Sequence, residues 1–87
     1  MKIYKEAIQI TDKQYISVPS GSEILTAQIQ HDKLQLWFLC DENENMVEVK
    51  QINIYGNGNP LPEDVGNYIS TVQTNNGALF WHVFEVE

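Results

Sequence analysis

The chain has 87 residues and a formal net charge of −7, with 12 acidic residues against five lysines and no arginine. This balance argues against duplex nucleic acid as a partner, because affinity for a polyanion comes largely from Lys and Arg that neutralise phosphates. The single cysteine, Cys40, excludes an internal disulfide framework, and Cys and His are too few for a structural zinc site. No apolar run reaches about 18 residues, so we expect an intracellular soluble protein with no membrane partner.

A chain of this length forms one domain, residues 1–87, with a small core. Such a domain buries only roughly 60 to 65% of the surface that its unfolded chain exposes, so a monomer is marginally stable. We therefore expect a homo-oligomer, since association adds buried surface that one small core lacks.

Short apolar runs of period two, separated by turn residues, cover most of the chain, and no window has the 3.6-residue period of a helix. The predicted fold is all-β, a small antiparallel β-sandwich or open barrel of about six or seven strands. In chain order the expected strands are Ile3–Ile10, Tyr15–Val18, Ile24–Gln30, Leu34–Cys40, Met46–Tyr55, Asn67–Thr74 and Ala78–Val86.

The expected strand Leu34–Cys40 has apolar side chains on both faces. Its even-numbered positions are all apolar, and Trp37 and Leu39 occupy the other face. We expect both faces to be covered, and the strand to form a hairpin with Ile24–Gln30 through a turn at His31–Lys33.

A long irregular loop is expected between Gly56 and Asn67, where three glycines and two prolines leave little regular hydrogen bonding. A single helical turn at Pro62–Val65 fits the proline at its first position. Loops this long in so small a domain are often functional. The last hairpin then turns at Asn75–Gly77, a sequence compatible with type I′ geometry.

Several groups that could carry chemistry also have structural interpretations. Cys40, paired with a histidine, would resemble a thiol nucleophile and its base, but it ends an apolar strand face and is expected to be a small buried side chain. His31 is read as a turn residue. The acidic turn 41–48 lacks the spacing and glycine of an EF-hand loop, and Glu63-Asp64 is explained by a helix N-terminus. No catalytic residue and no cofactor is predicted.

The strongest candidate for a binding site is the loop Gly56–Pro60. It lacks the lysine and the long helix of a Walker loop, but its glycines let the backbone approach a ligand, and its prolines stiffen it. Tight turns that need positive φ are the competing interpretation. The expected ligand-binding residues are Tyr55 and Trp81 as stacking surfaces, Gly56 and Gly58 for close approach, Asn57 and Asn59 as polar readers, Lys50 as the nearest charge, and His82 as a donor.

Most of the chain also carries a family resemblance. The segments concerned are Ile10-Thr11-Asp12, Pro19, Leu36-Trp37, Ile54–Pro62, Gly66-Asn67-Tyr68 and Trp81–Glu85. They resemble a family of short uncharacterised proteins encoded by tailed phages and prophages. The resemblance implies a phage origin and a location in the host cytoplasm, and it implies no activity and no site residues.

Two function classes follow as expectations. The chain is similar in size, and in its glycine loop beside aromatics, to phage anti-defence sponges, which bind a nucleotide second messenger without cleaving it. The first expectation is therefore a non-enzymatic sponge for a small nucleotide-type ligand, although the missing arginine removes the usual bidentate contact to phosphate. The alternative is a protein-interaction module that inhibits a host protein or serves in a phage structure, acting through a sheet edge or an aromatic patch.

Overall fold

A computed structural model describes all residues, 1–87, and contains seven strands and no helix. The strands are β1 (Lys2–Ile8), β2 (Lys13–Pro19), β3 (Glu23–Gln30), β4 (Lys33–Cys40), β5 (Val47–Gly56), β6 (Asn67–Thr74) and β7 (Leu79–Val86). Each predicted strand is present, with ends that differ by a few residues. The helical turn predicted at Pro62–Val65 is wrong, because residues 57–66 form only turns and irregular chain.

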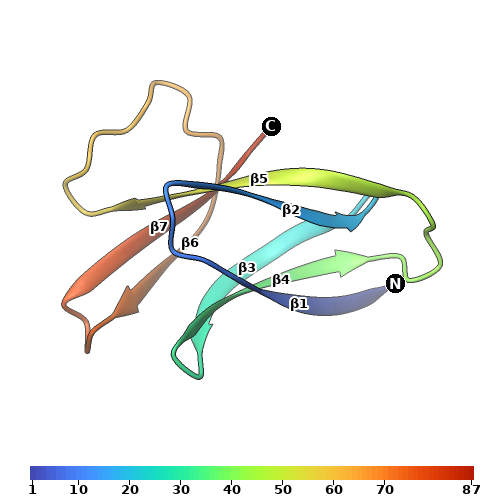
Figure 1. Ribbon diagram of the computed structural model, residues 1–87, viewed down its shortest axis with the longest axis horizontal. Helices are drawn as coiled ribbons and strands as arrows, with labels where there is room; N and C mark the ends of the chain where they lie inside the picture. Colours follow the sequence, from blue (N-terminus) through green and yellow to red (C-terminus); the bar gives the residue numbers. More distant parts are fainter.

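The strands form two antiparallel sheets, one in the order β1-β4-β3 and one in the order β2-β5-β7-β6 (Figure 1). The predicted all-β class is therefore confirmed, as a small β-sandwich. Only β3-β4 and β6-β7 are hairpins of consecutive strands. The pairs β1-β4, β2-β5 and β5-β7 join strands that are distant in sequence, so most of the register depends on long-range packing.

The core lies between the sheets and is built by strand alternation. All even-numbered positions of β4 from Leu34 to Cys40 are buried, and so are Ile52 and Ile54 of β5, with Ile54 opposite the buried Val83 of β7. The burial expected for Cys40 is confirmed. The full core is Ile8, Ile16, Val18, Ala27, Leu34, Leu36, Phe38, Cys40, Ile52, Ile54, Val72 and Val83.

The prediction that both faces of β4 are covered is wrong. Trp37 and Leu39 lie on the outer face of the three-stranded sheet and are only half-buried. They pair with Lys5 and Ile3 of β1, and Ile3 is 60% exposed. The apolar positions on this face thus reflect a sheet surface that no other part of the chain packs upon.

The two sheets are joined along one side, where β3 and β6 lie next to each other. The Ser70 hydroxyl accepts a hydrogen bond from the Ala27 N–H (2.9 Å) and bonds the Thr26 hydroxyl (2.9 Å). The edge of β3 is therefore covered by β6, which leaves β1 and β2 as the open edges of the sandwich.

The turns explain how the hairpins close. His31 and Asp32 both have positive φ (53° and 61°) and connect Gln30 directly to its partner Lys33, so the turn interpretation of His31 is confirmed. At the last hairpin, Asn75, Asn76 and Gly77 have positive φ. The predicted turn position is confirmed there too.

Candidate binding site

The loop after β5 is the centre of the predicted site and is the gold segment that leaves the sheets in Figure 1. It begins with a tight turn in which the Asn59 N–H donates to the Gly56 carbonyl oxygen (3.2 Å). Gly58, inside this turn, has a φ of +80°. The structural interpretation of this glycine, a position that favours positive φ, is therefore confirmed.

A cavity of about 270 Å³ lies at this loop and at the outer face of β5 and β7. Six of the eight predicted residues line it, all except Lys50 and Trp81. Leu61 and Phe84 line it as well and were missed by the sequence analysis. The lining residues are Tyr55, Gly56, Asn57, Gly58, Asn59, Leu61, His82 and Phe84.

Aromatic rings give the cavity its sheet-side wall. Tyr55 and Phe84 meet edge to face with ring centroids 5.9 Å apart, and Tyr68 meets the other side of Phe84 at 5.7 Å. Such edge-to-face pairs are favourable by about 0.5 to 1.5 kcal/mol beyond the area they bury. The three rings fix one another in place on the outer face of the four-stranded sheet.

His82 is held at both ring nitrogens. Its Nε2 donates to Asn57 Oδ1 (2.6 Å), because a carboxamide oxygen can only accept. In the neutral ring Nδ1 then accepts from the Thr71 hydroxyl (2.9 Å), and that hydroxyl oxygen accepts in turn from the Tyr68 hydroxyl (2.6 Å). His82 therefore positions the Asn57 carboxamide, whose N–H groups remain for another partner.

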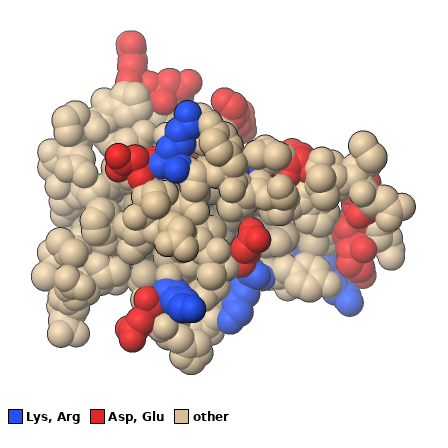
Figure 2. Space-filling model, viewed as in Figure 1, with Lys and Arg blue, Asp and Glu red and all other residues tan.

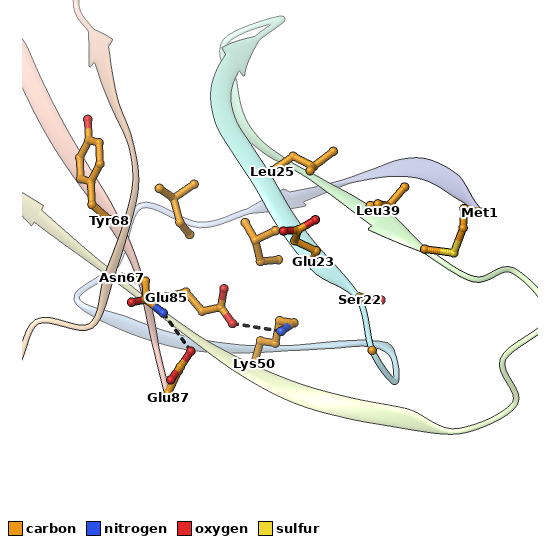
Figure 3. A pocket seen from close by; sticks show the side chains of 13 residues that line it. Met1, Ser22, Glu23, Leu25, Leu39, Lys50, Asn67, Tyr68, Glu85 and Glu87 are labelled. Atoms are coloured by element: carbon orange, nitrogen blue, oxygen red, sulfur yellow. Dashed lines mark hydrogen bonds and ion pairs between the residues drawn. The ribbon is translucent and has the colours of Figure 1, made fainter.

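Lys50 does not lie at the loop, so the prediction that it is the nearest charge is wrong. It shares the inner face of β5 with Ile52 and Ile54. Its amine forms an ion pair with Glu85 at 3.0 Å, and the two side chains are only 13% and 19% exposed (Figure 3). This pair lines a separate hollow, away from the loop, together with Glu23 and Tyr68.

Trp81 lies on the inner side of β7, so the prediction that it is a stacking surface of the loop site beside Tyr55 is wrong. In the register of β5 and β7, Tyr55 pairs with His82 and Gly56 pairs with Trp81. The indole packs against the core, and its Nε1 donates to the Thr74 hydroxyl (2.9 Å). A Cβ added at Gly56 would lie 3.2 Å from the indole ring, so Trp81 explains the glycine at that position.

The cation that does lie beside the loop is Lys13, at the start of β2. A second hollow, of about 400 Å³, is lined by Asp12, Lys13, Asn53, Tyr55, Asn59 and Pro60. It shares Tyr55 and Asn59 with the loop cavity. The two hollows therefore adjoin at these two residues, and Lys13 lines the second.

Charge elsewhere on the surface is mixed. On the face drawn in Figure 2 the lysine side chains lie apart, and acidic side chains lie beside several of them. No group of three or more His, Cys, Asp and Glu side chains has the geometry of a metal site. The structure contains no helix that could cross a membrane.

In a comparison with protein families, residues 1–87 match a domain of unknown function (DUF7352). The chain belongs to the DUF7352 family. No curated protein and no solved structure matches it.

In this DUF7352 protein two of the predicted site residues are replaced by others at the site. Lys13 and Phe84 take the places foreseen for Lys50 and Trp81, as the nearby cation and as an aromatic wall. One signal was present in the sequence, because Lys50 has the same parity along β5 as the buried Ile52 and Ile54. The place of Lys13 depends on its pairing with Asn53, which no local pattern indicates.

Proposed function

We propose that this DUF7352 protein is a non-enzymatic binding protein whose loop cavity holds the planar ring of a nucleoside-type ligand. The observation that carries the proposal is the meeting of two kinds of group in one cavity: the rings of Tyr55 and Phe84, and the carboxamides of Asn57 and Asn59. Aromatic rings bind a base through its faces, and carboxamides bind its polar edge.

The size and charge of the site limit which ligands it could hold. A cavity of about 270 Å³ is at the lower end of small-molecule sites, and it suits one base better than a whole cyclic dinucleotide. The rest of a nucleotide would extend past Tyr55 and Asn59 into the second hollow. Lys13 lines that hollow, with its amine 5.6 Å from the centre of the Tyr15 ring, and offers one positive charge for a phosphate, without the fork of an arginine.

We propose that the protein binds its ligand without converting it, because the one imidazole ring in the cavity already forms hydrogen bonds within the chain. His82 uses both nitrogens in hydrogen bonds within the chain, to Asn57 and Thr71. A general base needs a free nitrogen within reach of the substrate proton. In its specific form, the proposal is a phage-encoded sponge that sequesters a nucleotide immune messenger in the host cytoplasm.

A direct retention assay tests this function. The purified protein is incubated with cyclic di- and trinucleotides and with ADP-ribose derivatives, desalted, and heated, and the released compounds are identified by mass spectrometry. Intact release of one compound is expected. Release of a converted product would contradict binding without catalysis, and retention of none of them would contradict a nucleotide ligand.

Replacing both Asn57 and Asn59 by alanine is expected to weaken binding of the retained ligand by about 1 to 3 kcal/mol, which raises its Kd about 5- to 150-fold. The reason is the loss of polar contacts to the ligand, and calorimetric titration measures it. The control is the double variant Asn43→Ala/Asn45→Ala, which makes the same change in the exposed turn before β5, away from the cavity. Equal affinities for wild type and the loop variant would place the site elsewhere.

A second function, a protein-interaction module, is favoured by a different surface. Tyr15 of β2 and Val47 and Val49 of β5 share the outer face of the four-stranded sheet and are 60%, 68% and 63% exposed. Exposed apolar groups that cluster in this way are typical of protein contacts. This reading gains support if the retention assay finds no ligand and alanine at Val47 and Val49 abolishes inhibition of a host protein.

A further inference from the structure

The open edges of the two sheets differ in how well they are protected. Strand β2 ends at Pro19, which has no N–H to offer, and the Gln14 side chain bonds the N–H and carbonyl of Gln9 across the corner between β1 and β2. Strand β1 has no proline, and its only neighbour is β4. It runs along the border of the three-stranded sheet in Figure 1. Its seven residues thus leave a row of backbone groups available for pairing.

β1 is also exposed on both faces, which is unusual for a strand of a sandwich. Six of its seven residues are exposed, and only Ile8 is buried. Ile3 on the outer face is 60% exposed, and Tyr4 on the inner face, beside Phe38, is 44% exposed. These apolar groups gain burial only if something is added beside β1.

The sequence of β1 is complementary to itself in one antiparallel register. When two copies join edge to edge about a two-fold axis and form one continuous sheet, their inner faces lie on the same side. Directly opposite residues then have the same parity along the strand, so the axis passes midway between the two copies of one residue. An axis at Tyr4 places Lys2 opposite Glu6 of the second copy, twice, and Ile3 opposite the stem of Lys5. An axis at Lys5 places two lysines opposite each other, and one at Glu6 places two glutamates opposite each other. Opposite charges stabilise and like charges destabilise a cross-strand pair, so the Tyr4 axis is favoured.

The groups that this register needs are free in the single chain. The two ion pairs within the chain join the amine of Met1 to Glu42 and Lys50 to Glu85, and neither involves Lys2 or Glu6. Lys5 donates to the Gln30 side chain of β3, across β4 and away from the open edge. Its charge therefore stays clear of the new contact.

We infer that two copies of this chain pair through β1, antiparallel about an axis at Tyr4, and form one continuous six-stranded sheet from the two three-stranded sheets. The Tyr4 rings meet at the axis on the inner face, and the backbone groups of both edges are satisfied. The loop cavity belongs to the other sheet, so the dimer and the proposed ligand are independent of each other.

Charge reversal tests the register. Light scattering and sedimentation at micromolar concentration are expected to show a wild-type dimer. Lys2→Glu and Glu6→Lys each place two like-charged pairs in the interface and are expected to weaken the dimer by about tenfold or more. The double variant Lys2→Glu/Glu6→Lys restores opposite charges and is expected to return the affinity to within a few fold of wild type. A monomeric wild type, or single variants that dimerise like wild type, would overturn the inference.

Cross-linking tests the axis itself. Antiparallel partners lie about 4.5 to 5.5 Å apart at their Cα atoms, within the span of a disulfide. Tyr4→Cys is therefore expected to form a covalent dimer under mild oxidation, while Lys5→Cys, the matched control on the same strand, stays largely uncrosslinked. Cys40 is 1% exposed and does not compete. Preferential cross-linking of the Lys5→Cys variant would overturn the Tyr4 axis.

Discussion

Gly66→Ala is expected to destabilise the protein by about 3 to 5 kcal/mol, enough to unfold most of it. Gly66 has a φ of +87°, and a Cβ added there would lie 2.4 Å from the carbonyl oxygen of Glu85 and 3.1 Å from Val86 Cα. The atoms it meets are backbone atoms of β7, which pairs on both sides with β5 and β6. The backbone of Glu85 is held by pairing on both sides, with Ile52 and with Asn67, so it cannot move away easily, and both the strained φ and the overlap are costly.

Gly58→Ala is the matched control for this prediction. Gly58 also has a positive φ, +80°, in the same loop, but a Cβ there meets no atom within 4 Å. Its cost is the left-handed backbone alone, about 1 kcal/mol. Urea unfolding of both variants, followed by circular dichroism, separates strain from overlap. Similar losses in the two variants would show that the contact of Gly66 with β7 does not decide its identity.

Local patterns in the sequence were sufficient to find the strands and the hairpins. Period two in β4 and β5 follows from burial of one sheet face, and the Asn75–Gly77 segment admits positive φ whatever surrounds it. The helical turn predicted at Pro62–Val65 failed for a physical reason. A single turn has too few hydrogen bonds to persist without packing, and these residues are mostly exposed.

The candidate site was only partly predictable, because it depends on pairs of strands that are distant in the chain. The loop itself, from Gly56 to Asn59, follows from its glycines. The facing residues follow from the register that sets Tyr55 beside His82 and Lys13 beside Asn53. A shift of one position would turn Trp81 outward and His82 inward, and only the packing of the whole sandwich selects between these registers.

The same dependence on long-range packing makes Leu36→Ala the second change with a large expected effect. Leu36 is 0% exposed at the centre of β4. It lies between β1 and β3, where it pairs with Glu6 of β1 and Ala27 of β3. Its truncation is expected to cost about 2 to 5 kcal/mol, because the cavity left in a thin core has few neighbours that can move to fill it. Thermal and urea unfolding measure this loss.

Leu39→Ala, on the outer face of the same strand, is the control. Leu39 is half-buried beside Ile3, and nothing in the chain packs over it, so its truncation leaves no closed cavity and is expected to cost about 1 kcal/mol. The comparison separates the two faces of β4, each of which carries a leucine at one of these positions. If both variants lose the same stability, the outer face must be covered in solution, and the edge-to-edge dimer through β1, which leaves that face open, would not account for it.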